Sequence, residues 1–457
     1  MTISNWNSTA GCDPTRVVTP KDLDHLVTIV NDGDVERSPS PVRAVGSLHS
    51  LNPCFTTTGT LVQMKSDAFR YIRDPGNDSV TVGAGVTMID LKEALKAHGL
   101  QIPVTPEIGD ATAGSVACCG TKDASLDNGW GQISSTVTGA RIVDATGTER
   151  AVTADELRAF RSSYGLFGIV HEVTFETCPL QRVEYASESI PISELTVDRA
   201  LGRADGFLGF MLPYLGKFVA ERRTLVPGRP LSHTKDRGIR TEIWKRGGFP
   251  FTTLSEYLGG LGSSFGLPSH LDPAAIFDRG FETTFTHLGP FVTDRVDTMI
   301  HFDRKGDHFF DFAFWAFPLH TWREAIPAYV QFCQDFLGTF GFRPALPTEV
   351  YRIKHDRNAL LSFSPAEDVF TLDMVHMLHH GPGSRDQRDL WDRMNDDFNT
   401  QIALRFGARP LLNQTKRLTP EIVRDTLGDD WTTFAQFRAQ KDPGSRFLSD
   451  YFAQLGA

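Results

Sequence analysis

The sequence predicts an α+β protein with two lobes, and three observations lead to this expectation. With 457 residues, the chain is long for a single hydrophobic core. Residues 1–180 alternate short strand-like and helix-like segments with stretches of Gly, Ala and Ser, whereas longer aromatic-rich segments begin at about residue 181. Many of the 33 phenylalanines lie in this second part, which indicates a large apolar core or a lined pocket there.

The N-terminal lobe is expected to contain short strands and amphipathic helices. A helix is predicted over residues 19–32, because Thr19 can cap it and Pro20 suits the first helical position. Residues 88–100 predict an amphipathic helix that Gly99 ends. The remaining segments predict strands at 42–46, 60–64, 79–85 and 168–180, and a hairpin over 137–152.

The second lobe is expected to combine long helices with apolar strands. A helix is predicted over residues 321–341, with a kink or a late start caused by Pro327. A second amphipathic helix is predicted over residues 385–407, and a helix-rich tail closes the chain from residue 419. Strands are predicted at 310–317 and 369–377.

The composition argues against several classes of partner. A net charge of -10 is unsuited to nucleic acid as the main partner, because phosphate binding requires a basic surface. No stretch approaches the 18 apolar residues of a membrane span, and the N-terminus shows no signal peptide. The six cysteines lack zinc-type spacing, so we expect free thiols in a reducing compartment, the cytoplasm.

Two motifs suggest chemistry that the surrounding sequence does not support. Gly83 and Gly85 follow a predicted strand, but Met88 stands where a dinucleotide-binding turn needs Gly or Ala, so we expect a strand-end turn. His376 and His380 are four residues apart, yet their segment predicts a strand followed by a loop, on which this spacing does not form a metal site. We therefore expect no metal, while His376 stays a candidate proton acceptor.

Several segments, in their order along the chain, resemble the vanillyl-alcohol-oxidase type of FAD-binding flavoprotein, and within it the aldonolactone/alditol oxidase branch. The segment 42–50, VRAVGSLHS, matches the family's R-x-x-G-x-x-H-S loop, and 106–125 takes the place of its Gly-rich loop. The tail 434–456 carries the R-x-x-x-D-P-x-x-x-F pattern. The resemblance implies an FAD-binding domain formed by residues 1–180 and 406–457. A substrate (cap) domain of antiparallel sheet and helices would span residues 181–405.

The resemblance also implies how FAD is held. Glycines in both loops allow main-chain N–H groups to approach the cofactor closely. His49 is expected to carry the flavin covalently through its 8α-methyl group, the alternative being a loop histidine that only forms hydrogen bonds. Cys54 is expected to pack without bonding to the cofactor. The further expected FAD-binding residues are Arg43, Ala44, Val45, Gly46, Ser47, Leu48, Ser50, Gly109, Ala113, Gly114, Ser115, Cys118, Cys119, Gly120, Thr121, Ile169 and Val170.

The family places a Glu-x-Arg pair and a lysine in the substrate domain, and this chain departs from both patterns. Glu349 and Tyr351 share one face of a regular strand, while Arg352 points to the other. Either a bulge brings Glu349 and Arg352 together, or Tyr351 replaces the arginine. Lys416 matches the family's lysine without the His-Trp that precedes it. Asp311 is a further candidate, because an acid within an apolar run requires a reason.

The implied reaction is a two-electron oxidation of an alcohol-type small-molecule substrate, with hydride transfer to flavin N5 and reoxidation by O2 to give H2O2. The phenylalanine content leaves a second reading open, in which a dehydrogenase or a specialised-metabolite oxidase or cyclase acts on a larger apolar or amine substrate. A third interpretation is a flavin-binding protein without catalytic activity.

Overall fold

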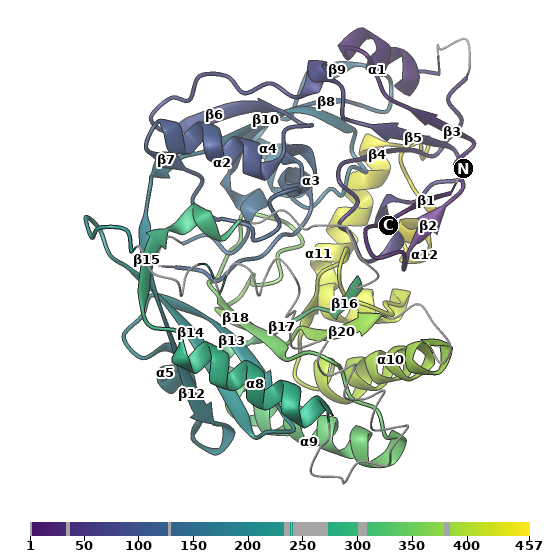
Figure 1. The fold of residues 1–457 in the computed structure, drawn as a ribbon. Helices are drawn as coiled ribbons and strands as arrows, with labels where there is room; N and C mark the ends of the chain where they lie inside the picture. The colour runs from purple at the N-terminus through teal and green to yellow at the C-terminus, as the bar shows by residue number, and fades with distance from the viewer. Residues whose placement is uncertain are drawn as a thin grey trace.

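N-terminal and C-terminal segments share one lobe, and central segments form the other (Figure 1). The computed structural model describes residues 2–32, 37–126, 129–232, 238, 240, 273–299, 309–378 and 384–457. Within these residues, helices and sheets are both well represented, as an α+β class requires.

The N-terminal lobe contains two principal sheets. The first is parallel, in the order β3 (Arg16–Val18), β5 (Thr60–Gln63), β4 (Val42–Val45). The second is antiparallel, in the order β6 (Ser79–Gly83), β10 (Ile169–Glu176), β8 (Val137–Val143), β9 (Glu149–Ala151). Two short pairs complete the lobe, β1 (Ile3–Ser4) with β2 (Gly11–Cys12) and β7 (Leu100–Gln101) with β11 (Cys178–Pro179).

The helices of this lobe are short and depend on local caps. Helix α1 (Leu23–Val30) begins three residues later than predicted, at Leu23 and not at Pro20. The Asp22 carboxylate accepts from the backbone N–H of His25 at 2.8 Å and so serves as the N-cap. Helix α2 (Met88–Ala97) ends just before Gly99, whose φ of 69° closes it as predicted. The other helices are α3 (Ala113–Cys118) and α4 (Ala154–Phe160).

The central segments form one large antiparallel sheet. Its order is β15 (Phe291–Asp294), β12 (Arg182–Pro191), β14 (Lys217–Leu225), β13 (Gly206–Leu212), β18 (Thr348–Ile353), β19 (Val369–Thr371), β17 (Trp315–Pro318), β21 (Arg409–Pro410). A separate pair joins β16 (Phe309–Ala313) to β20 (Met374–Leu378). The helices of this region are α5 (Val197–Leu201), α8 (Pro273–His287), α9 (Trp322–Phe340) and α10 (Ser384–Phe398).

Three predictions for the second lobe needed correction. The strand predicted over 310–317 is two strands in two different sheets, β16 and β17, which separate at Phe314. Helix α9 begins at Trp322 and runs continuously through Pro327, its sixth residue, so the helix neither starts late nor breaks there, although the proline removes one intrahelical hydrogen bond. Helix α10 passes at Asn399 into a π-helical turn, so the predicted helix over 385–407 is not one regular element.

Most of the described phenylalanines form the cores of the central lobe. Phe207, Phe218 and Phe370 pack with Trp322 through edge-on ring contacts. A second cluster stacks Phe281 on Phe285, beneath the other face of the sheet strands. The aromatic content is therefore explained chiefly by core packing and gives little support to a large apolar substrate.

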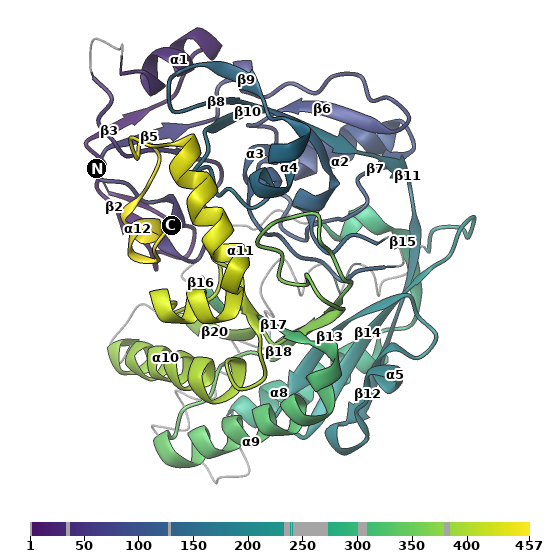
Figure 2. The ribbon, with the colours of Figure 1, turned by 180° about the vertical axis from the view of Figure 1, so that it is seen from behind.

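The C-terminal segment returns to the N-terminal lobe through α11 (Pro420–Lys441) and α12 (Asp450–Gln454), seen in yellow in Figure 2. The buried guanidinium of Arg43 donates to the carbonyl of Phe447 at 3.1 Å and to that of Tyr164 at 2.6 Å. The Asp442 carboxylate accepts from the N–H of Phe447 at 2.8 Å. These bonds fix the turn between α11 and α12 against β4, just before the loop that carries His49.

Candidate active site

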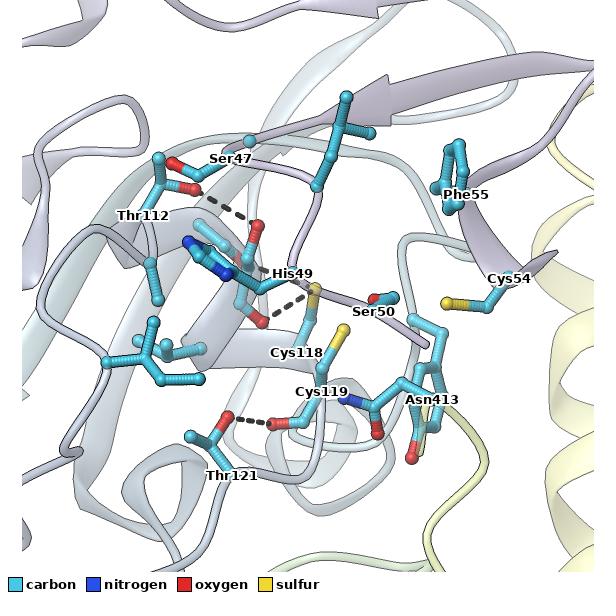
Figure 3. A pocket seen from close by; sticks show the side chains of 18 of the residues that line it. Ser47, His49, Ser50, Cys54, Phe55, Thr112, Cys118, Cys119, Thr121 and Asn413 are labelled. Carbon is cyan, nitrogen blue, oxygen red and sulfur yellow. Dashed lines mark hydrogen bonds between the residues drawn. The ribbon is translucent and has the colours of Figure 1, made fainter. Parts of the chain in front are cut away.

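A cavity lies where the two lobes meet, and three parts of the chain line it (Figure 3). The N-terminal lobe contributes the loop after β4, the segment from Pro106 to Lys122 and the start of β10. The central segments contribute Phe312, Phe314 and residues of β18. The C-terminal segment contributes its polar residues Asn413 and Gln414.

The loop after β4 presents polar groups that the protein itself leaves without partners. Within the described residues, the main-chain N–H groups of Gly46, Leu48, His49 and Ser50 have no acceptor. Leu48 has a φ of 60°, a left-handed conformation that turns the backbone at this point. Cavity-lining N–H groups without acceptors suit the negatively charged oxygens of a phosphate.

His49 is the central side chain of this loop (Figure 3). Its imidazole is 13% exposed, and the buried Nε2 atom makes no hydrogen bond, although it lies 3.6 Å from an Asp110 carboxylate oxygen. The ring centroid lies 6.3 Å from that of Trp6. A buried ring nitrogen that lines a cavity without a hydrogen bond requires an explanation, and a bonded ligand supplies one.

Two glycines allow this loop and the Gly-rich segment to approach closely. A Cβ atom at Gly46 would lie 2.1 Å from Thr112 Oγ1 and 2.7 Å from Ser115 Oγ. A Cβ atom at Gly114 would lie 2.8 Å from that of Ala84. No side chain fits at either position, so the loop can lie against Thr112 and Ser115, and α3 can lie against Ala84 at the end of β6. The lining residues fit a flat cofactor with a phosphate-bearing tail.

Most of the expected FAD-binding residues line this cavity, and four do not. Ile169 and Val170 are neighbours on β10, so they face opposite sides, and Ile169 packs into the core with Leu26 and Val143. Gly120 packs against Leu411, where a Cβ atom would lie 2.2 Å from Cδ1. Gly109 and the buried Ala113 are also absent from the lining, which includes Arg43, Ala44, Val45, Gly46, Ser47, Leu48, His49, Ser50, Gly114, Ser115, Cys118, Cys119, Thr121 and Val170.

Three free thiols also face the cavity. Cys54, Cys118 and Cys119 line it and appear beside the His49 loop in Figure 3. Cys54 packs with Tyr164 in a buried cluster, and burial raises the pKa of its thiol. Cys54 therefore packs as expected, although its side chain also reaches the cavity wall.

Strand β18 places Glu349 and Tyr351 together on the cavity side. The register of β18 against β13 is regular from Thr348 to Tyr351, so no bulge brings Arg352 to that face. Arg352 instead pairs with Asp368 at 2.8 Å. Tyr351 therefore stands where the family's arginine would be, and its hydroxyl donates to Glu349 Oε2 at 3.1 Å.

Lys122 and Asp373 join this pair, and neither was predicted from the sequence. The Lys122 ammonium forms an ion pair with Asp373 and lies 3.9 Å from Glu349 Oε2. It also lies 3.7 Å from the centroid of the Tyr351 ring. The available signals were weak: a lysine after the Gly-rich segment, and an acid in the apolar run around residue 373.

Burial shifts both carboxyl groups towards neutral pH. Burial raises the pKa of Glu349 to about 7, against the opposing effect of the Lys122 charge. Burial likewise raises the pKa of Asp373 to about 6, again opposed by Lys122. A carboxyl group with a pKa near 7 can accept a proton at neutral pH and also release it.

Three predicted catalytic residues lie outside the cavity lining. Lys416 pairs with Asp311 at 2.7 Å and donates to the carbonyl of Leu51. The ion pair explains why the acidic Asp311 occurs within an apolar run. Arg352 points to the opposite face of β18. His376 packs against Trp391, and its Nδ1 accepts from the N–H of Ala345 at 3.3 Å. Strand alternation and these pairings direct all three away from the cavity, and His379 and His380 fall outside the described residues.

Two further observations concern metals and membranes. Across the described ranges, no three His, Cys, Asp or Glu side chains are placed to hold a metal ion. In the same ranges, no helix combines the length and the apolar character that a bilayer crossing requires.

Comparison with known proteins identifies relatives of both ends of the chain. Residues 14–153 match the FAD binding domain family, and residues 306–455 match the D-arabinono-1,4-lactone oxidase family. L-gulono-1,4-lactone dehydrogenase of Mycobacterium tuberculosis is 27% identical over 464 residues, which are 98% of this chain and 97% of that protein. L-gulonolactone oxidase of Bos taurus is 24% identical over 216 residues, 46% of this chain and 48% of that protein, so the match spans about half of that relative.

A solved structure resembles the whole fold. A cholesterol oxidase from Brevibacterium sterolicum superposes with a TM-score of 0.75 and covers 99% of this chain and 96% of its own, at 15% identity. At that identity the likeness shows a shared fold.

Proposed function

Since the chain belongs to the aldonolactone oxidase branch of the vanillyl-alcohol-oxidase type of FAD-linked oxidases, we propose that it oxidises a CH–OH group of a small hydroxylated substrate with the help of one FAD. The matches to the two family models confirm the family expected from the sequence, and the likeness to the cholesterol oxidase structure confirms the fold. Sugar lactones are the substrates to test first, because the relatives are named for L-gulono-1,4-lactone and D-arabinono-1,4-lactone.

One observation carries the proposal: a single cavity contains both the His49 loop and the cluster of Glu349, Tyr351, Asp373 and Lys122. The loop offers N–H groups without acceptors, which suits the cofactor. The cluster offers a proton acceptor and polar groups, which suit a substrate hydroxyl. Phe312 and Phe314 add apolar side chains to the wall of the same cavity.

The residues divide the chemistry between them. When bound, FAD supplies a two-electron acceptor that takes the hydride and passes its electrons to O2, giving hydrogen peroxide. Glu349, in its ionised form, takes the hydroxyl proton, so that the substrate carbon becomes a carbonyl carbon. Tyr351 orients Glu349 through its 3.1 Å hydrogen bond. Asn413 and Gln414 border the same space and are available to hold other substrate oxygens.

The covalent link through His49 is part of the proposal. Its support is that His49 lines the cavity and that its buried Nε2 atom has no hydrogen bond. A neutral imidazole nitrogen is a competent nucleophile near neutral pH. The alternative is a histidine that stabilises the loop without bonding to FAD.

The electron acceptor has a second candidate. A relative that aligns over nearly the whole chain is named a dehydrogenase, which favours an acceptor other than O2. The test mixes the flavin-loaded protein anaerobically with the two lactones and with alditols while the flavin absorbance is recorded. Bleaching supports the proposal, and peroxide formed after air is admitted distinguishes the oxidase from the dehydrogenase. Failure of all these substrates to bleach the flavin would overturn the proposed activity.

A further inference from the structure

We propose that Lys122 and Asp373 are positioning residues of this reaction: Asp373 anchors the Lys122 ammonium beside Glu349, and the lysine keeps Glu349 able to accept the substrate's proton. This inference rests on the proposed function. It concerns two residues 251 positions apart that the family pattern does not mark.

Three neighbouring side chains hold the Lys122 ammonium in one position. Its ammonium is held by Asp373, lies over the Tyr351 ring at 3.7 Å from the centroid, and is 3.9 Å from Glu349 Oε2. The lysine side chain is 13% exposed and that of Asp373 is 1% exposed. An ammonium enclosed in this way is held in position, because leaving would strand a buried carboxylate without a counterion.

The backbone holds the two acids together. The N–H of Glu349 donates to the carbonyl of Asp373 at 3.0 Å, and the N–H of Asp373 donates back at 2.9 Å. The side chains of Glu349 and Asp373 therefore share one cation. The like charge of Asp373 raises the proton affinity of Glu349, and Lys122 lowers it.

Among the described residues, Lys122 is the cation that lowers the pKa of Glu349 and of Asp373, because the nearby arginines are paired with other acids. Glu107, from the Gly-rich segment, also raises the pKa of Glu349, but it pairs with Arg223 at 3.0 Å and lies 3.9 Å from Arg240. Both arginines are also bound to the buried Glu221. Tyr351 contributes the neutral hydrogen bond described above.

The arrangement has a consequence for the substrate. Lys122 and Glu349 place a donor and an acceptor 3.9 Å apart, which two oxygens on neighbouring carbons can engage together. A substrate carboxylate would face Glu349 and Asp373, and Lys122 is already paired. The cluster therefore favours an uncharged hydroxylated compound over the corresponding acid anion.

The test uses Lys122→Met and Asp373→Asn in the flavin-loaded protein, with kcat/KM measured against pH on the best substrate from the screen. Loss of the cation should move the acid limb of the profile up by about one pH unit or more. Loss of the neighbouring carboxylate should move it down by a similar amount. A purely structural role would lower rates without moving the limb in opposite directions.

A second readout does not depend on turnover. Removing Lys122 leaves two buried carboxylates without a counterion, so the Tm of Lys122→Met should fall further below the wild type at pH 8 than at pH 5.5. Lys96→Met is the matched control, because Lys96 also bridges two aspartates, Asp294 and Asp297, at 2.9 and 2.8 Å but lies away from the cavity. The acid limb of the kcat/KM profile of Lys96→Met should lie at the same pH as that of the wild type.

The outcomes separate the two proposals. Wild-type turnover with unmoved limbs in both variants would overturn this inference alone. If Lys122→Met fails to fold, Lys122→Arg should restore folding, and Asp373→Asn still tests the sign of the effect. Absence of flavin reduction by any hydroxylated substrate in the wild type would overturn the proposed function and this inference with it.

Discussion

The Tyr351 hydroxyl donates to Glu349 Oε2 at 3.1 Å, across two residues of the same strand. The family's Glu-x-Arg pair would place a permanent cation at this position. A phenol cannot provide that charge, so the compensating cation comes from Lys122 on a segment of the other lobe. The polar end of the cavity is thus assembled from both lobes.

Replacing Glu349 by Gln should reduce kcat by about 100-fold to 10,000-fold, because the amide cannot accept the hydroxyl proton. Stopped-flow recording of flavin reduction under anaerobic conditions measures this step directly. Flavin content should stay at the wild-type level. Glu188→Gln, which removes a surface carboxylate paired with Arg199 and Arg222, is the control and should reduce the flavin at the wild-type rate. A Glu349→Gln protein with wild-type reduction rates would assign the proton to another group.

Replacing His49 by Ala should abolish flavin that remains with the protein after SDS denaturation. The reason is that the proposed link passes through the buried Nε2 atom. In-gel flavin fluorescence and the intact mass of the denatured protein measure the link. Retention of the fluorescence by His49→Ala would move the attachment to another residue, and its absence from flavin-loaded wild type would leave His49 as a non-covalent contact.

Replacing Gly46 by Ala should lower flavin content, because the new Cβ atom would lie 2.1 Å from Thr112 Oγ1 and push the loop away from α3. The flavin-to-protein absorbance ratio after purification in excess FAD measures this. Gly338→Ala is the matched control: this glycine lies within α9, and a Cβ there meets no atom within 4 Å. It should keep its flavin and gain up to about 1 kcal/mol of stability. Equal flavin loading in the two variants would contradict the role given to Gly46.

Replacing Glu156 by Gln should weaken the attachment of the end of helix α11, which carries Lys441, at neutral pH. Burial tends to raise the pKa of Glu156, but hydrogen bonds from Lys441 and Arg150 outweigh it and lower the pKa to about 2. Because the folded-state value is the lower one, the stabilisation is complete above about pH 4.5 and disappears as the pH falls towards 2. We expect a loss of roughly 1–2 kcal/mol at pH 7 and about a quarter of that at pH 2.5, where the folded-state carboxyl is still partly ionised, measured by urea unfolding. An equal loss at both pH values would mean that the ion pair does not carry the effect.

The sequence by itself determined the local features of the protein. Strand alternation placed Glu349 and Tyr351 on one face, and the register confirms that Arg352 lies on the other. The loop with His49 and the tail with Phe447 follow motifs that are short and contiguous. Such features depend on residues within one turn or one strand, where chain geometry alone decides which side chains share a face.

Only the tertiary structure decided the pairing of distant charges. Lys416 stands at the position of the family's lysine but forms an ion pair with Asp311. Lys122 pairs with Asp373, which is 251 residues away in the sequence. The strand predicted over 310–317 divides between two sheets at Phe314, so that its two halves have different neighbours. A buried charge takes whichever opposite charge the packed segments bring within reach, and that choice depends on the spatial arrangement of sheets, which no short segment encodes.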